Sequence, residues 1–334
     1  MKSLRIATLN CLNLALPGRR FYNGVEPYSA DEYIAKTQWL AAMLDRLAAD
    51  LVLLQEVFHE QALSDVVRQS AGGARLWSLA APLAGQDNAR PRLGIVWRQP
   101  WRPALQSLAD FPPGCAVEVP EDGPHAKFSR PLLRADLPLP QFGVGAALTI
   151  FNVHLKSRRP DFAGGEDTGE PRLAARAQLR SLIRRGAEAA ALRCILEQAA
   201  AATPAPLIVA GDFNDDAGAV TTRIVADPWS EADGRSQAGL RLFDAFDVGQ
   251  RSEGAGAARP APFTILDGRP GRIDHVLLSR HFVPGSHDAV GRVAAVEVFG
   301  DHLLERRRPA DGRTPYERIY ADHAAVCVTL ESLA

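Results

Sequence analysis

The stretch that decides the fold reads Leu207-Ile208-Val209-Ala210-Gly211-Asp212-Phe213-Asn214. A short apolar run that ends in polar residues is typical of a buried β-strand. Asp212 and Asn214 are two residues apart, so both side chains can point to one face at the strand end. Gly211 allows the backbone to approach a neighbouring segment closely. A polar turn explains the same residues equally well, so the rest of the chain must decide between the two.

Five more polar clusters lie at one end of an apolar run. They are Asn10 after residues 4–9, Gln55-Glu56 after 51–54, Asn152-Val153-His154 within 147–154, Ile273-Asp274-His275 before 276–278, and Asp322-His323 before 324–328. Each cluster alone has an ordinary explanation as a polar strand end in water. Together they supply carboxylates, amides and imidazoles, the groups that hydrolysis of a phosphate ester requires.

The positions of the clusters constrain the sheet. Asn10, Glu56, His154 and Asp212 follow their apolar runs, whereas Asp274 and the Asp322-His323 pair precede theirs. If all of them converge, strands of opposite direction must present opposite ends to one edge. An all-parallel doubly wound sheet, which binds ligands at carboxyl ends only, is then excluded. We therefore expect mixed or antiparallel sheets with helices outside.

Hydrophobic periodicity predicts the remaining elements. Between two buried strands, a 3.6-residue period through Ile34, Leu40, Met43, Leu44 and Leu47 predicts a helix over 31–49, which Ser29 or Asp31 can cap. The other expected strands are 4–9, 51–57, 93–97, 131–137, 147–154, 206–211, 273–279, 292–299 and 324–330, the other helices are 172–201 and 218–226, and the loops are 15–29, 82–92, 110–127, 158–171, 227–239, 249–262 and 300–316.

Composition bounds the class of protein. The chain has 334 residues, of which 46% are hydrophobic and 23% charged, as in ordinary soluble globular proteins. A site assembled from both ends of the sequence requires one folded unit, so we expect a single domain over 1–334. The net charge of -1 provides no general basic field, and binding of nucleic acid would need a local patch.

The cysteines and the N-terminus indicate a compartment. Cys11, Cys115, Cys194 and Cys327 are widely separated in the sequence, which favours reduced thiols over a zinc site. The first expected strand begins at residue 4 and leaves no room for an export signal. No apolar run reaches about 18 residues, so no membrane span is expected. These features predict a cytoplasmic protein.

The clusters suggest individual roles. Glu56 ends a strand, where a rigid carboxylate suits Mg²⁺ or Mn²⁺. Asp212 could activate water, and Asn214 could donate to a phosphate. Asp274 can accept from His323 and raise its basicity. Asp322 could add a carboxylate on the metal side.

The ordered set of motifs resembles the endonuclease/exonuclease/phosphatase superfamily, which includes deoxyribonucleases, abasic-site endonucleases, sphingomyelinases, inositol polyphosphate 5-phosphatases and poly(A) deadenylases. The resemblance spans nearly the whole chain, and its most specific parts are Gly211-Asp212-Phe213-Asn214, Ile273-Asp274-His275 and Asp322-His323. One departure is Ala321-Asp322-His323-Ala324-Ala325-Val326, where many members have Ser-Asp-His-x-Pro-Val. The Asp and His remain, so this departure affects the subgroup and not the chemistry.

The resemblance implies a four-layer α/β/β/α sandwich, an α+β arrangement of two mixed β-sheets packed face to face with helices outside. It implies that Asn10, Glu56 and Asp322 lie at the metal and that His154 and Asn214 contact the phosphate and leaving group. It implies that Asp212 and His323 handle the attacking water, with Asp274 behind His323. Which of the two takes the proton is left open. Arg130 resembles a phosphate-contacting arginine of some members, and Thr264 falls where members carry a residue beside the site.

The function expected from these features is metal-dependent hydrolysis of a phosphodiester. A nuclease acting on nucleic acid is the leading interpretation, because arginines flank Asn10, His154 and Asp322. The near-neutral charge favours the alternative, a phosphatase or phosphodiesterase acting on a small-molecule or lipid phosphoester. A non-catalytic binding module is a further alternative. No obligate protein partner is evident.

Overall fold

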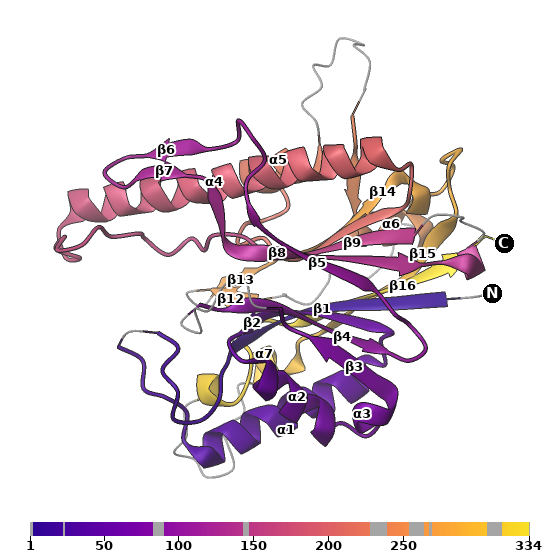
Figure 1. Cartoon of the computed structure of the whole chain (residues 1–334), viewed down its shortest axis with the longest axis horizontal. Coiled ribbons are helices and arrows are strands. Elements are labelled where there is room, and N and C mark those ends of the chain that lie inside the picture. Colours follow the sequence, from indigo (N-terminus) through magenta and orange to yellow (C-terminus); the bar gives the residue numbers. More distant parts are fainter. Residues whose placement is uncertain are drawn as a thin grey trace.

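The computed structural model of the chain describes residues 3–22, 24–82, 90–142, 147–227, 239–253, 264–266, 269–305 and 316–333. Two six-stranded sheets face each other, and helices cover their outer faces (Figure 1). The first sheet has the order β15 (Gly291–Phe299), β16 (Ala325–Ser332), β1 (Ser3–Leu14), β2 (Leu51–Val57), β4 (Arg92–Arg98) and β3 (Trp77–Ala80). The second has the order β11 (Leu242–Asp244), β14 (Asp274–Ser279), β10 (Leu207–Asp212), β9 (Ala147–His154), β8 (Lys127–Pro138) and β5 (Ala104–Asp110).

Helices form the two outer layers. The first sheet is covered by α1 (Ala30–Leu47), α2 (Glu60–Gln69) and α3 (Gly73–Leu76), and the second by α4 (Pro171–Ala202) and α5 (Val220–Ala226) (Figure 1). The other elements are α6 (Ala245–Glu253), α7 (Asp301–Glu305), the 3-10 turns Pro140–Phe142, Arg280–Phe282 and Tyr316–Arg318, and the ribbons β6 (Val117–Val119) with β7 (Gly123–His125) and β12 (Thr264–Leu266) with β13 (Arg269–Gly271). The predicted four-layer sandwich is confirmed.

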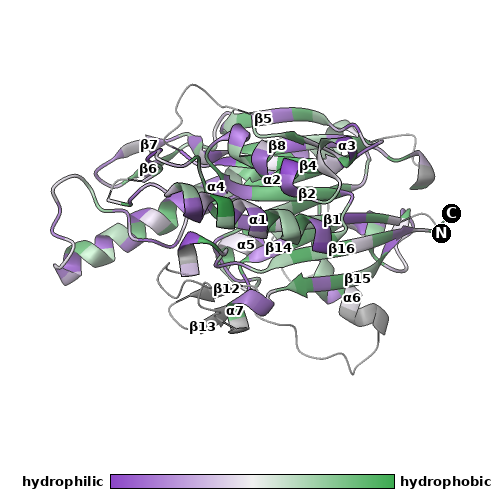
Figure 2. Cartoon of the chain, turned by 90° about the horizontal axis from the view of Figure 1, so that it is seen from below, coloured by the Kyte–Doolittle hydropathy of each residue, from purple (hydrophilic) through white to green (hydrophobic). Residues whose placement is uncertain are grey.

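Three apolar layers separate the four structural layers. On β10, Ile208 packs between the two sheets, whereas Val209 packs under α4. On β2, Leu53 likewise faces the other sheet and Leu54 faces α1. Both faces of the central strands are buried, which explains why they read as continuous apolar runs without alternation. The hydropathy colouring follows this pattern, with apolar strands inside and polar segments outside (Figure 2).

The helix α1 starts as the sequence predicts. Ser29 and Glu32 form a capping box, in which each side chain bonds to the backbone N–H of the other residue. One expected core position is wrong: Ile34 is 49% exposed. The buried face runs instead through Lys36 and Thr37, because the helix is rotated so that 33, 37, 40 and 44 meet the sheet.

Several elements lie where the sequence predicts loops or nothing. The expected loop 110–127 contains the β6–β7 ribbon, α6 extends into the expected loop 249–262, and α7 lies within the expected loop 300–316. α2 was missed although its buried Ala62, Leu63, Val66 and Val67 follow a helical period. The expected loop residues 23, 83–89, 228–238, 254–262 and 306–315 lie outside the described residues.

Strand directions agree with the constraint derived from the sequence. β1 runs parallel to β2 and antiparallel to β16, and β10 runs parallel to β9 and antiparallel to β14. Both sheets are therefore mixed. The carboxyl ends of four strands and the amino ends of two others meet at one edge of the sandwich.

The four cysteines are free thiols, and Cys11 and Cys327 are buried. Cys115 and Cys194, which are 79 residues apart, bring their sulfur atoms to 3.2 Å. In the described part of the chain, no helix is long and apolar enough to cross a membrane.

Candidate active site

The polar clusters meet at this edge of the sandwich. Asp212 pairs with His154 on β9 and with Asp274 on β14, and Asn10 pairs with Gln55 on β2. The two sheets then face each other across the site. Residues more than 300 positions apart in the sequence are thereby brought into one cluster.

Asn10 connects the two sheets. Its Nδ2 donates to Glu56 Oε1 at 3.2 Å and to Asp212 Oδ2 at 3.1 Å. Glu56 Oε2 also accepts from the backbone N–H of Asn13 at 3.0 Å. Asn10 Oδ1 accepts from the Leu12 N–H, so the amide nitrogen of Asn10 faces the carboxylates. These bonds hold the Glu56 carboxylate rigidly at the end of β2.

The Gly211–Asn214 segment is a strand end and a polar turn at the same time. Asp212 Oδ1 accepts from the Asn214 N–H at 2.8 Å, which is the Asx-type bond of a turn. Gly211 has φ 143°, and a Cβ there would lie 2.0 Å from the Val153 carbonyl oxygen. Only glycine therefore allows β9 and β10 to approach this closely beside the site.

Two residues of the candidate site have strained backbone conformations. Glu56 has φ 61° and Asn214 has φ 54°, in the left-handed region that is uncommon for residues other than glycine. Such strain costs about 1–3 kcal/mol per residue and clusters at functional sites. The sequence predicts both residues as members of the site.

His323 is held by a carboxylate. Its Nδ1 lies 2.7 Å from Asp274 Oδ2, and its Nε2 lies 4.0 Å from Asp212 Oδ2 and 3.8 Å from Asp322 Oδ1. Burial alone would lower the pKa of His323, but the carboxylates of Asp274, Asp322 and Asp212 outweigh it and raise the pKa well above the usual value. Nδ1 donates to Asp274, and this bond directs Nε2 into the site.

Asp212 and His154 are shifted in different directions. Burial raises the pKa of Asp212 to about 7, although the nearby charge of His323 opposes the rise. Burial and the charge of Arg130 lower the pKa of His154 well below its usual value, so this imidazole is neutral. Its Nε2 lies 3.4 Å from Asp212 Oδ2, and its Nδ1 has no hydrogen-bond partner among the described residues. Titratable groups whose pKa values are displaced in a cluster are typical of acid–base sites.

The donor set fits a hard divalent cation. Glu56 and Asp322 supply carboxylate oxygens, which Mg²⁺ and Mn²⁺ prefer. The buried Asp322 Oδ1 has no hydrogen-bond partner in the described part of the chain, and Thr264 Oγ1 holds the Asp322 carbonyl at 3.0 Å. Asp212, Asp274 and His323 also form a group compact enough for an ion. In that group, however, Asp274 already bonds to His323, and this pairing is typical of a proton relay.

The Leu155 carbonyl orients the two candidate phosphate donors. Asn214 Nδ2 donates to it at 2.9 Å and Arg130 Nη1 at 3.4 Å. Behind it, the fully buried Glu188 of α4 accepts from the backbone N–H of Lys156 at 2.7 Å and of Ser129 at 2.9 Å. Glu188 thus ties the segment after His154 to the segment that carries Arg130.

Some residues of the clusters are structural. His275 bonds to Asp244 and to the Asp215 carbonyl, and is fully buried away from the site. Arg158, one of the flanking arginines, pairs with Asp215 and Asp216. The flanking Arg306, Arg307 and Arg308 lie outside the described residues.

The sequence did not predict two buried charges near the site. Lys36 is fully buried on α1, and its pKa falls to about 8, mainly through burial. Its spacing from Leu40, Met43 and Leu47 places it on the buried face, a signal that the helical period contains. Glu188 has no such signal, because its partners are backbone groups of distant loops.

A family model of the endonuclease/exonuclease/phosphatase family matches residues 7–302. No curated protein sequence matches the chain. Many solved structures match the chain, and three of them illustrate the shared fold. They are a D. rerio TDP2 humanised by 14 mutations (15% identity, 99% of each chain covered, TM-score 0.56), the human Nocturnin catalytic domain (16%, 99% of this chain and 94% of that one, 0.54), and a family protein from Bacteroides thetaiotaomicron (18%, 98% and 97%, 0.55).

The fold and the family match define a metal-dependent phosphoester hydrolase of the two-sheet α/β sandwich class. Within that class, the chain belongs to the endonuclease/exonuclease/phosphatase family. At identities of 15% to 18%, the likeness to these solved structures shows the fold and not the substrate.

Proposed function

We propose that the protein is a Mg²⁺- or Mn²⁺-dependent phosphodiesterase that cleaves nucleic acid. The observation that carries this proposal is the contact of the His323–Asp274 pair with Asp212, one hydrogen bond away from the Asn10–Glu56 pair. The proposed proton acceptor and the candidate cation site are therefore close enough to act on the same scissile phosphate.

Glu56 and Asp322 would hold the cation, and Asn10 would position the Glu56 carboxylate. When bound, the cation would neutralise the phosphoryl oxygens. His154 and Asn214 would contact the phosphate and the leaving oxygen, with Arg130 beside them. A neutral His154 can donate one hydrogen bond without carrying a charge.

Asp212 is the group we assign as the proton acceptor. A carboxylate with a pKa near 7 is matched to removing a proton from water at neutral pH. His323, whose raised pKa keeps it protonated there, supplies a positive charge next to the developing oxyanion. Asp274 stabilises that imidazolium and keeps its ring oriented.

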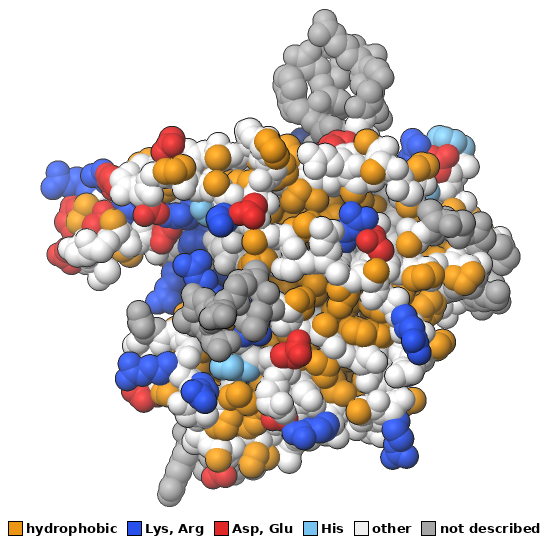
Figure 3. Space-filling view, viewed as in Figure 1, with side chains coloured by type: hydrophobic (Ala, Val, Ile, Leu, Met, Phe, Trp, Pro, Cys, Tyr) orange, Lys and Arg blue, Asp and Glu red, His pale blue; other side chains and the backbone are white. Residues whose placement is uncertain are grey.

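Exposed arginines support nucleic acid as the substrate. Arg19, Arg20 and Arg159 are exposed on loops that follow β1 and β9. Lys and Arg side chains gather on the left flank of the face in Figure 3, the flank toward which β1 runs in Figure 1. Such a local patch can bind a phosphate backbone although the net charge is only -1. The engagement of Arg158 by two aspartates favours the second candidate, a small-molecule or lipid phosphoester.

The test is cleavage of plasmid, single-stranded DNA and RNA with Mg²⁺ or Mn²⁺, with bis-p-nitrophenyl phosphate and sphingomyelin in parallel. We expect nucleic acid to be cut by the wild type and not by Asp212→Ala. Hydrolysis of the small esters alone would replace the nuclease by the second candidate. No metal-stimulated hydrolysis of any ester would leave a binding module.

A further inference from the structure

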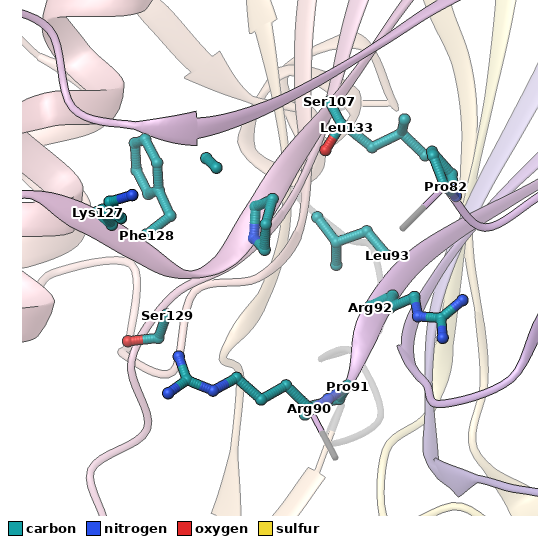
Figure 4. A pocket seen from close by; sticks show the side chains of 12 residues that line it. Pro82, Arg90, Pro91, Arg92, Leu93, Ser107, Lys127, Phe128, Ser129 and Leu133 are labelled. Carbon is teal, nitrogen blue, oxygen red and sulfur yellow. The ribbon is translucent and has the colours of Figure 1, made fainter. Parts of the chain in front are cut away.

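A pocket of about 200 Å³ opens between the two sheets, at the amino ends of β4 and β8 (Figure 4). Its walls are largely apolar. They are formed by Pro82, Pro91, Leu93, Phe128, Pro131 and Leu133. β4 belongs to one sheet and β5 and β8 to the other, so the pocket is a slot between the two sheets.

The strand register places this slot beside the candidate active site. Leu133 of β8, which lines the slot, pairs with Asn152 of β9, two residues before His154. In the other sheet Arg92 pairs with Val57, the residue after Glu56. Neighbouring strands are about 4.8 Å apart, so the slot is the next position along the edge from the site.

The slot also has polar residues in its lining. Ser107 of β5 and Ser129 of β8 line it, and Arg90 extends from the start of β4 toward Ser129 (Figure 4). Lys127 also lines the slot, and its largely exposed ammonium lies 3.2 Å from Asp110. The cationic side chains of the lining complement a phosphate-bearing ligand, while hydroxyl groups can bond to the edge of a polar ring. Apolar walls that include the Phe128 ring, with a few polar groups, suit a planar heterocycle.

We propose that this slot receives the nucleobase of the nucleotide adjacent to the scissile phosphate. The inference rests on the proposed function and names its substrate class. A slot between two sheets admits one base and not a base pair, so the base must be unpaired. The substrate is therefore single-stranded nucleic acid, or a strand end whose terminal base can leave its stack.

The test measures binding rather than cleavage. Calorimetric titration with Mg²⁺ present compares a 5′-nucleoside monophosphate with ribose 5-phosphate, which has the same phosphate and sugar but no base. We expect the wild type to bind the nucleotide at least 10-fold more tightly. Ser107→Trp fills the slot from the exposed strand β5 and should reduce this ratio to about one. Gln106→Trp, exposed on the same strand and outside the lining, should leave it unchanged.

Equal affinities of the wild type for the nucleotide and for ribose 5-phosphate would contradict the proposal that the slot binds a nucleobase. An unchanged ratio of these affinities in Ser107→Trp would contradict it as well. Tighter binding of octyl phosphate than of the nucleotide would also contradict the proposal and would indicate that the slot binds an alkyl chain. The proposed function has a separate readout. If the protein hydrolyses nucleic acid but does not discriminate the base, only the proposal for the slot fails. If it discriminates the base but hydrolyses no nucleic acid, only the proposed nuclease activity fails.

Discussion

At the scale of single residues, Asp212 has the most connected carboxylate of the site. It accepts from Asn10 and from the Asn214 N–H, and it faces His154 and His323. Asp212→Asn keeps the size of the side chain but only one acceptor oxygen, so it loses one of these two hydrogen bonds together with the proposed proton acceptor. We expect kcat to fall by roughly 10²–10⁴-fold. Asp216→Asn, an exposed acid of the same loop, is the matched control and should retain activity.

Retention of more than about a tenth of the wild-type kcat in Asp212→Asn would assign the proton to another group. His323 would then be the first alternative, because its Nε2 faces the same space.

The same residues predict how stability depends on pH. The pKa values of Asp212 and His323 are both raised in the folded protein, so the folded state binds more protons than the unfolded state. Their contribution to stability is present at low pH and is lost as pH rises. For Asp212 the loss runs from about pH 4 to 7, and for His323 it continues above pH 6.5. Urea unfolding of metal-free protein should show a less negative pH slope between 4 and 7 in Asp212→Asn. An unchanged slope would argue against the raised pKa.

Glu56 provides the test of the cation site. Glu56→Gln keeps one oxygen but removes the negative charge that a hard cation requires. We expect at least about a 10-fold weaker Mg²⁺ affinity in calorimetry without substrate, with Glu118→Gln on the exposed β6 as the control. Equal affinities in the two variants would move the cation to the Asp212, Asp274 and His323 group.

At the scale of elements, α4 does more than cover a sheet. Glu188 accepts from two backbone N–H groups, and glutamine would turn an NH₂ group toward one of them. Glu188→Gln should therefore misplace Arg130 and the Leu155 carbonyl and raise KM by roughly 5–20-fold, with a smaller effect on kcat. Glu197→Gln, on the same helix but bonded to Leu240, should affect stability alone.

A purely structural role for Glu188 would give a different result. The melting temperature of Glu188→Gln would then fall while KM stayed at the wild-type value.

The positions of α1, α4 and the central strands were predictable because hydrophobic period and capping are local properties, as the Ser29–Glu32 capping box illustrates. The rotation of α1, which exposes Ile34 and buries Lys36, was not predictable because it depends on what the sheet offers to the helix.

At the scale of the whole molecule, Asn152 joins the two sheets. From β9 its Nδ2 donates to the carbonyls of Leu54 at 3.1 Å and Gly94 at 2.9 Å, and its Oδ1 accepts from Gln55 at 2.7 Å. Asn152→Ala leaves these buried groups without partners. The free energy of unfolding should fall by about 1–3 kcal/mol, and activity should fall with it because the sheets also carry the two halves of the site.

Thr149→Val is the comparison for Asn152→Ala. Thr149 lies on the same strand but bonds to Asp136 within one sheet. Its loss should lower stability without changing kcat. A fully active Asn152→Ala protein would show that the register of the two sheets does not depend on this bond.

The sequence by itself determined which strands end in chemical groups, the order of those groups, and the need for opposite strand directions at one edge. These are properties of short segments and of their polarity along the chain. Only the tertiary structure decided that Asn10 lies 3.1 Å from Asp212, that Glu188 accepts from the Ser129 N–H, and that an apolar slot lies between β4 and β8. Such distances depend on how two sheets pack and twist against each other, and no local pattern encodes the meeting of residues 202 positions apart.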